Sequence, residues 1–249
     1  MIEPLSRPSR VELLEVDRIR LVETAPPRVP PEEREAMNRV WEQAVRANPS
    51  LFDGPAAACA GLEREGPRGL VLTWVRTTYR HYALRRVPGA TASLPSLFVA
   101  VVQPTNDGRL LVGRMSASTA SPGRWQLPGG SAEPPQGREP LDTSALRRHA
   151  ARELAEETGL DTAPGELRLW LVTHDEEGHV GVLFLAPHRP ESLLRERYAA
   201  LVSSETAHGR EPELARIAFV RSPAEVAGLD GTHVAFLKPV IAHWGSAAT

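Results

Sequence analysis

Three glutamates on one face of a predicted helix constrain this chain more than any other feature. Residues 152–160 read RELAEETGL, and Glu153, Glu156 and Glu157 are spaced i, i+3 and i+4. On a helix, this spacing places their Cβ atoms about 5–6 Å apart. Carboxylates this close repel one another unless a cation lies among them. The alternative is an acidic face in solvent, on which Arg152 pairs with Glu156.

The rest of this helix follows from the same spacing. Leu146, Ala150 and Leu154 step by four and form an apolar face that can pack on a core. Gly159 suits the left-handed residue that ends a helix. Three polar residues at the other end are candidates for the N-cap: Asp142, Thr143 and Ser144.

The segment before the helix predicts a short strand and a bare loop, WQLPGG at residues 125–130. Loop and helix together resemble the Nudix box, G-x5-E-x7-R-E-U-x-E-E-x-G-U, in which U is apolar. The second half of the box matches at every specified position, and Pro128, Gly129 and Gly130 match its strand-loop entry. The chain is therefore identified as a member of the Nudix hydrolases.

The spacing within the box departs from that family. Gly130 and Arg152 are 22 positions apart, where the pattern has 14, so the early box glutamate would fall on Ser144. Glu133 and Glu139 lie in the inserted stretch, which is rich in proline and expected to be exposed beside the substrate. In the family the early glutamate mainly supports the loop. Its absence therefore affects the expected loop geometry of residues 131–143 more than the expected metal binding.

Composition is that of an ordinary soluble protein of one or two domains. The 249 residues are 41% hydrophobic and 24% charged, with a net charge of −2 that predicts no nucleic-acid or membrane partner. Cys59 is the only cysteine, which excludes an intrachain disulfide. Residues 1–20 lack an apolar signal segment and no run is long enough to span a membrane, so we expect a cytoplasmic protein.

Residues 1–94 predict a small α+β subdomain placed before the Nudix domain of residues 95–249. A helix over residues 31–46 should bury Met37, Val40, Trp41 and Val45. A short helix is predicted over residues 77–86. The expected strands fall within residues 11–23, 57–62 and 70–75, the last two forming a hairpin.

Residues 95–249 predict strands mixed with a few helices. Residues 97–102 are continuously apolar, as expected of a strand covered on both faces. Further strands are expected at residues 110–115, 167–173, 180–186 and 217–220, and helices at 190–203, from 222, and at 234–244. This order fits the fold of Nudix enzymes, an α+β fold in which an α/β/α sandwich contains a mixed sheet.

A second resemblance covers parts of residues 38–220. The N-terminal motifs are similar, in the same order, to those of the animal Nudix enzyme that hydrolyses UDP-glucose and UDP-galactose. They are VWE at residues 40–42, NPxLFDGP at 48–55 and TTYRHY at 77–82. Trp41, Phe52 and Tyr79 are expected to be packing residues of a shared fold, although Tyr79 is also a candidate for substrate binding. Arg80 is the better ligand candidate, because a guanidinium suits phosphate or uracil oxygens.

The resemblance implies a Mg²⁺-dependent pyrophosphohydrolase, with Mn²⁺ as the alternative ion. Arg152 is expected to orient the carboxylates, and Gly129 and Gly130 to approach the substrate. The general base is either Glu153 or a later glutamate, with Glu213 preferred over Glu211 and Glu205. The implied metal ligands are Glu153, Glu156, Glu157 and the carbonyl of Gly130, and the implied catalytic residues are Glu153, Glu157, Glu213 and Arg152.

Several functions remain open from sequence. The preferred substrate is UDP-glucose or UDP-galactose, cleaved to UMP and sugar 1-phosphate. The alternatives are another nucleoside diphosphate derivative or a (d)NTP, and a Nudix-fold sensor that binds a nucleotide without hydrolysing it. The proline that follows the box in ADP-ribose hydrolases is absent, since His174 and Asp175 stand at its position. His149 lies one turn before Glu153 and could approach the site, although a capping or surface role is expected. A homodimer is expected because Nudix enzymes are often dimers.

Overall fold

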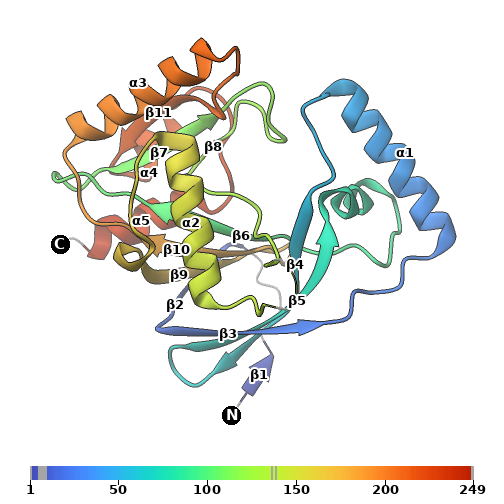
Figure 1. Cartoon of the computed structure of the whole chain (residues 1–249). Helices are drawn as coiled ribbons and strands as arrows, with labels where there is room; N and C mark the ends of the chain where they lie inside the picture. The colour runs from blue at the N-terminus through green and yellow to red at the C-terminus, as the bar shows by residue number, and fades with distance from the viewer. Residues whose placement is uncertain (1, 5–9, 136, 138, 248–249) are drawn as a thin grey trace.

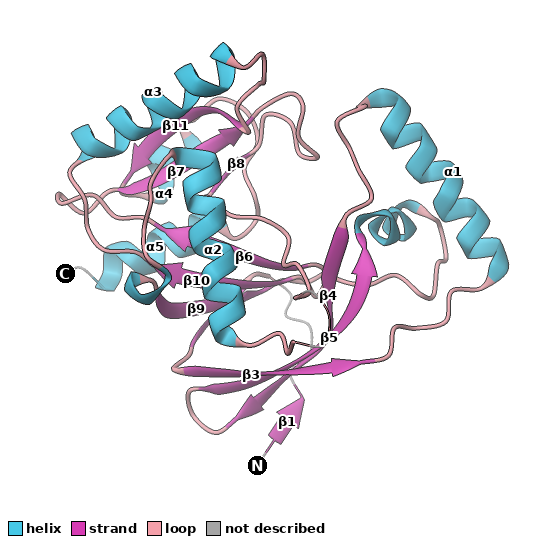
Figure 2. Cartoon of the chain, viewed as in Figure 1, coloured by secondary structure: helices cyan, strands magenta, loops and turns pink. Residues whose placement is uncertain are grey.

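The structure is a computed structural model that describes residues 2–4, 10–135, 137 and 139–247. Its strands form three sheets, with helices on the outside (Figures 1 and 2). The strands are β1 (Ile2–Pro4), β2 (Glu12–Glu15), β3 (Arg18–Thr24), β4 (Pro55–Glu65), β5 (Gly69–Thr78), β6 (Leu97–Val102), β7 (Leu110–Met115), β8 (Trp125–Gln126), β9 (Arg168–His174), β10 (Val180–Leu185) and β11 (Leu214–Val220). The helices are α1 (Pro31–Ala47), α2 (Thr143–Thr158), α3 (Glu191–Ala207), α4 (Pro223–Ala227) and α5 (Leu237–Ala247), with 3-10 helices η1 (Tyr79–Arg86) and η2 (Pro164–Glu166). Within this described part, no helix combines the length and apolar character needed to cross a membrane.

The first sheet, in the order β1-β4-β5-β3, belongs to the N-terminal part of the chain. β4 and β5 pair antiparallel, which confirms the predicted hairpin, and β3 runs parallel to β5. The helix predicted over residues 77–86 is only partly correct, since its first two residues end β5 and the rest form η1. The backbone N–H of Arg80 donates to Asp53 and that of Tyr79 to the Gly54 carbonyl, so the first N–H groups of η1 bond to the preceding loop.

The packing predicted for α1 is confirmed only in part. Each of its four large apolar side chains is only half-buried: Met37, Val40, Trp41 and Val45. α1 packs mainly against η1, where Trp41 meets Tyr79 edge-on, and Figure 1 shows it standing away from α2 and α3. Phe52, also expected to pack, is 76% exposed. The apolar face of α1 thus remains partly accessible to solvent.

The second sheet, in the order β2-β9-β10-β6, is the centre of the molecule. β6 and β10 are parallel, while β9 pairs antiparallel with both β10 and β2, so the sheet is mixed as predicted. Side chains of β6 alternate between two cores. Val99 and Val101 pack with Leu154 of α2, whereas Ala100 and Val102 pack with Ile241 of α5. The α/β/α sandwich is therefore confirmed, because a helix covers each face of this sheet.

The third sheet, β11-β7-β8, is antiparallel and carries the loops beside α2. The predicted elements of residues 95–249 are confirmed with their ends shifted by a few residues, whereas η2 was not predicted. Residues 1, 5–9, 248 and 249, and residues 136 and 138 of the predicted inserted loop, lie outside the described part.

The boundary near residue 94 stays a prediction. β2, from the N-terminal part, pairs with β9 in the central sheet, and Glu12 lies opposite His174. The main hydrophobic core also includes Trp74 and Leu72 of the first sheet together with Leu146 of α2. The N-terminal part therefore shares its core with the rest of the chain.

Candidate active site

Helix α2 is capped at both ends and packs on the central sheet. Asp142 accepts a hydrogen bond at 2.7 Å from a backbone N–H of the first turn, so the N-cap is one of the predicted candidates. Gly159 ends the helix with φ of 72°, as predicted. Leu146, Ala150 and Leu154 are fully buried. Since these residues hold one face on the core, the glutamates face the loop that follows β8.

Glu157 is the most buried of the three glutamates. Its side chain is 2% exposed, and one carboxylate oxygen accepts a hydrogen bond from the Gly129 N–H at 2.8 Å. Burial raises the pKa of Glu157 well above its ordinary value, and the charges of Glu213 and Glu153 raise it further. The bond from Gly129 lowers this pKa but does not reverse the shift. The ionised form of Glu157 is therefore costly unless a cation approaches it.

This shift predicts that metal-free protein loses stability as the pH rises. The unfolded chain releases the Glu157 proton near the ordinary pKa of 4.5, whereas the folded protein keeps it until the raised pKa. Between these two values the native state binds more protons, so the free energy of unfolding falls with rising pH. Chemical denaturation in chelator from pH 4.5 upwards should show this fall, and Glu157→Gln should reduce it.

The matched control is Glu196→Gln, which changes an exposed acid on α3. It should keep the pH dependence of the wild type. Parallel stability curves for wild type and Glu157→Gln across this pH range would contradict a raised pKa at Glu157.

Glu153 is held from two sides. One carboxylate oxygen lies 2.7 Å from Nε2 of His149, one helical turn earlier. The other lies against the loop, since a Cβ atom added to Gly130 would stand 2.5 Å from it. A Cβ atom at position 130 would therefore displace this carboxylate from its present position.

Glu156 and Arg152 lie at the outer edge of the cluster. The guanidinium of Arg152 is 3.1 Å from Glu133 and 3.8 Å from Glu156, and all three side chains are about half-exposed. Partial burial raises the pKa of Glu156, and the charge of Glu153 raises it further. The pairing of Arg152 with Glu156 weighed from sequence is therefore present, and Arg152 also contacts the inserted loop.

Glu213 joins the three helix glutamates from the start of β11. Its backbone carbonyl accepts a hydrogen bond at 2.9 Å from the N–H of Ser116. The side chain is open to solvent, yet partial loss of hydration, followed by the charges of Glu153 and Glu156, raises the pKa of its carboxyl. Glu205, the rival base, instead pairs with Arg210 at 2.6 Å, which lowers the pKa of Glu205. The structure thus brings Glu213, and not Glu205, to the cluster.

The glycine loop is docked on β6 by its backbone. Val99 donates to the Gly130 carbonyl at 2.9 Å, and the Gly130 N–H donates to the Val99 carbonyl at 3.1 Å. Gly129 has φ of 152°, and a Cβ atom there would lie 2.2 Å from the Val99 carbonyl oxygen. The Gly130 carbonyl keeps a second lone pair, so it remains open as the predicted metal ligand.

The chemistry of this cluster fits a hard divalent cation. Mg²⁺ prefers carboxylate and carbonyl oxygens. Burial, followed by the charges of neighbouring glutamates, raises the pKa values of Glu157 and Glu213. Among the described residues, no three His, Cys, Asp or Glu side chains stand in an arrangement that holds a metal. Glu153, one of the predicted ligands, is hydrogen-bonded to His149 and keeps its second carboxylate oxygen beside Gly130.

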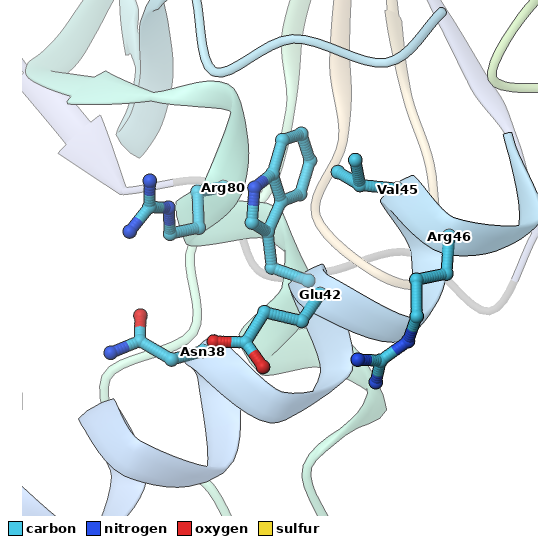
Figure 3. Close-up of a pocket in the computed structure, with 6 residues that line it drawn as sticks. Asn38, Glu42, Val45, Arg46 and Arg80 are labelled. Carbon is cyan, nitrogen blue, oxygen red and sulfur yellow. The ribbon is translucent and has the colours of Figure 1, made fainter. Parts of the chain in front are cut away.

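Arg80 and Tyr79, the predicted substrate-binding side chains, lie on η1 beside α1. Nε of Arg80 is 3.0 Å from an Asp53 carboxylate oxygen, and the ring centroids of Tyr79 and Trp41 are 6.3 Å apart. Arg80 lines an open pocket of about 410 Å³ (Figure 3). The rest of its lining comes from α1: Asn38, Trp41, Glu42, Val45 and Arg46. No glutamate of α2 lines this pocket, so the structure does not bring Arg80 together with the carboxylate cluster.

The family model of the NUDIX domain matches residues 95–244, more than half of the chain. The chain belongs to the NUDIX family. It is accordingly a hydrolase acting on pyrophosphate bonds. The matched region contains the glycine loop, α2 and Glu213, so the family assignment and the carboxylate cluster concern the same part of the chain.

Solved NUDIX structures resemble the chain at low identity. A MutT protein from Methanosarcina mazei Go1 is 18% identical with a TM-score of 0.41, covering 62% of this chain and 96% of that one. A NUDIX hydrolase from Nitrosomonas europaea is 19% identical, with a TM-score of 0.36 and coverage of 62% and 90%. The NUDIX domain of Shewanella oneidensis NrtR, complexed with ADP ribose, is 17% identical, with a TM-score of 0.39 and coverage of 62% and 88%. No curated protein matches the chain.

The insertion in the NUDIX box is anchored on both sides. Glu133, near its start, contacts Arg152, while the carbonyl of Pro135 accepts a hydrogen bond from Arg76 of β5 at 2.8 Å. Glu133 is exposed as expected, but Pro135 is half-buried. The inserted loop therefore links the box helix to the N-terminal sheet.

The structure shows the alternative position of His149, close to the glutamates of α2. Its expected capping or surface role is replaced by burial, with 5% of the residue exposed, and by the contact with Glu153. The signal was present in the i, i+4 spacing of the two residues, which puts them on one helix face.

Proposed function

We propose that this NUDIX hydrolase is a Mg²⁺-dependent pyrophosphohydrolase of UDP-glucose or UDP-galactose that releases UMP and sugar 1-phosphate. The observation that supports a hydrolytic centre is the convergence of four glutamates beside the glycine loop, with raised pKa values at Glu156, Glu157 and Glu213. The sugar nucleotide rests on the N-terminal motifs that resemble the animal UDP-sugar hydrolase.

The metal would be held by Glu153, Glu156, Glu157 and the carbonyl of Gly130, with Mn²⁺ as an alternative ion. When bound, such an ion neutralises phosphate oxygens and lowers the pKa of bound water. Arg152 contacts Glu156 and thereby orients it.

A carboxylate must accept the proton of the attacking water. The water oxygen forms a bond to phosphorus, the phosphoanhydride P–O bond breaks, and the proton passes to Glu213 or Glu153. Glu213 is suited to this step because its raised pKa makes it a stronger base, and its side chain is open to solvent. A positioned base of this kind contributes about 10²–10⁴-fold to the rate.

Substrate recognition is assigned to the glycine loop and to η1. Gly129 and Gly130 have no side chains, which lets the pyrophosphate approach the backbone. Arg80 would bind a phosphate or uracil oxygen, and Tyr79 would support it by packing against Trp41. Because Arg80 lies outside the carboxylate cluster, this role concerns the part of the substrate distant from the cleaved bond.

The assignment to Arg80 predicts a defect in binding and not in chemistry. Arg80→Ala should raise KM about 10-fold, the effect of losing one hydrogen bond to a charged group, and leave kcat within about 2-fold. Steady-state kinetics measure both values. The control is Asp53→Asn, which removes the charge paired with Arg80 but keeps the guanidinium, and should leave KM near the wild type. Equal KM changes in the two variants would assign Arg80 a structural role only.

A nucleotide panel with Mg²⁺ tests the function itself. UDP-glucose, UDP-galactose, ADP-ribose and dNTPs are incubated with the protein, and the products are resolved by chromatography. Turnover of the UDP-sugars alone supports the proposal. Turnover of another nucleotide in their place identifies that nucleotide as the substrate. Binding without turnover of any compound supports the nucleotide sensor. A homodimer and the absence of a nucleic-acid partner stay predictions.

A further inference from the structure

We propose that His149 is a positioning residue, which fixes the carboxylate of Glu153 and ties it to the inserted loop. The inference deepens the proposed function and rests on it, because Glu153 is a metal ligand or base only if the cluster is hydrolytic. His149 itself has no assigned part in the reaction.

The hydrogen bonds of His149 define which ring nitrogen carries the proton. The backbone N–H of Glu133 donates to Nδ1 at 3.3 Å. A backbone N–H can only donate, so Nδ1 presents its lone pair and the proton lies on Nε2. Nε2 therefore donates to the Glu153 carboxylate at 2.7 Å. In this tautomer the ring orients the Glu153 carboxylate. Residues that hydrogen-bond to a metal ligand orient that ligand in the same way.

Burial makes this arrangement rigid. His149 and Glu153 have side chains only 6% and 13% exposed. The second oxygen of Glu153 is confined by Gly130, so the carboxylate is bounded by the imidazole on one side and by the glycine loop on the other. A buried group held in this way cannot leave its rotamer without losing a hydrogen bond.

The inserted loop explains why this chain needs such a residue. The early glutamate of the box would fall on Ser144, which is exposed at the start of α2 and has too short a side chain for that role. His149 instead binds the loop backbone at Glu133, while Arg152 binds the side chain of the same residue. These two contacts fix the inserted loop to α2 beside Glu153.

Two substitutions separate the two bonds of His149. In His149→Gln, the amide nitrogen of glutamine can take the position of Nε2 and still donate to Glu153. In His149→Asn, the side-chain oxygen of asparagine can take the position of Nδ1 and still accept from the Glu133 N–H. We expect His149→Asn to lower kcat about 10- to 100-fold with KM within about 3-fold, and His149→Gln to keep kcat within about 3-fold. Thermal unfolding of both variants shows whether stability is equally affected. Equal losses of kcat in the two variants, or none in His149→Asn, would overturn the role.

Two further measurements need no turnover. The ¹⁵N shifts of the His149 ring in metal-free protein should show a protonated Nε2 and an unprotonated Nδ1; the reverse pattern would refute the hydrogen-bond assignment. Titration with Mn²⁺ should show weaker binding by His149→Asn than by His149→Gln, and equal affinities would contradict the proposal. If the wild type hydrolyses no nucleotide, the proposed function fails while the ring tautomer still decides the geometry of His149.

Discussion

Replacing Glu157 with glutamine is expected to lower kcat about 10³-fold or more while making the metal-free protein more stable at neutral pH. The loss follows from removing a negative charge at the centre of the proposed metal site, where charge stabilisation of the transition state is concentrated. The gain follows because the ionised side chain is almost fully buried and is repelled by Glu213 and Glu153. Opposite changes in activity and stability distinguish a functional carboxylate from a structural one.

The fold should survive this substitution. Glutamine has the shape of glutamate, and its amide oxygen can still accept the hydrogen bond from the Gly129 N–H. Turnover is measured with the nucleotide that the wild type hydrolyses, and unfolding by circular dichroism in chelator. Glu196→Gln, on the exposed surface of α3, should match the wild type in both measurements. A Glu157→Gln variant that keeps its activity would remove this residue from the proposed mechanism.

The second large effect is a contrast between two adjacent glycines. Gly129→Ala is expected to destabilise the fold by about 2–5 kcal/mol, because its φ of 152° disfavours a side chain and the Cβ would meet the backbone of β6 at Val99. Gly130→Ala should leave stability nearly unchanged and lower kcat about 10- to 100-fold. There the three atoms nearest to the new Cβ all belong to the carboxyl group of Glu153, which can swing away but then leaves its position.

Urea unfolding and steady-state kinetics on the two alanine variants separate these outcomes. The matched control is Gly165→Ala, since a Cβ atom there meets nothing within 4 Å. It should change neither stability nor rate appreciably. If Gly130→Ala unfolds as readily as Gly129→Ala, the close approach of Glu153 to the glycine loop is wrong.

Features carried by local periodicity were predictable. The ends of α2, its apolar face and the common face of Glu153, Glu156 and Glu157 depend on residues three and four positions apart. The two-sided burial of β6 followed in the same way from its unbroken apolar run. The β4–β5 hairpin was predictable because its strands are close in sequence.

The errors have a common cause in packing. α1 has the apolar spacing of a buried helix, yet it packs mainly against η1 and Trp41 stays half-buried. Most of the surface of Phe52 is exposed to solvent. His149, for which a capping or surface role was expected, is buried, and the backbone N–H of Glu133 in the inserted loop donates to its ring.

The sequence by itself determined the NUDIX box helix, its three glutamates and the order of strands around it, since short-range periodicity and motif spacing carry that information. Only the tertiary structure decided that Glu213 joins the cluster, that Gly129 and Gly130 dock on β6, and that the backbone N–H of Glu133 donates to His149. These depend on contacts between segments far apart in the chain, or on how a loop of unusual length closes. Such contacts are selected by the free energy of the whole packed core, which no local pattern encodes.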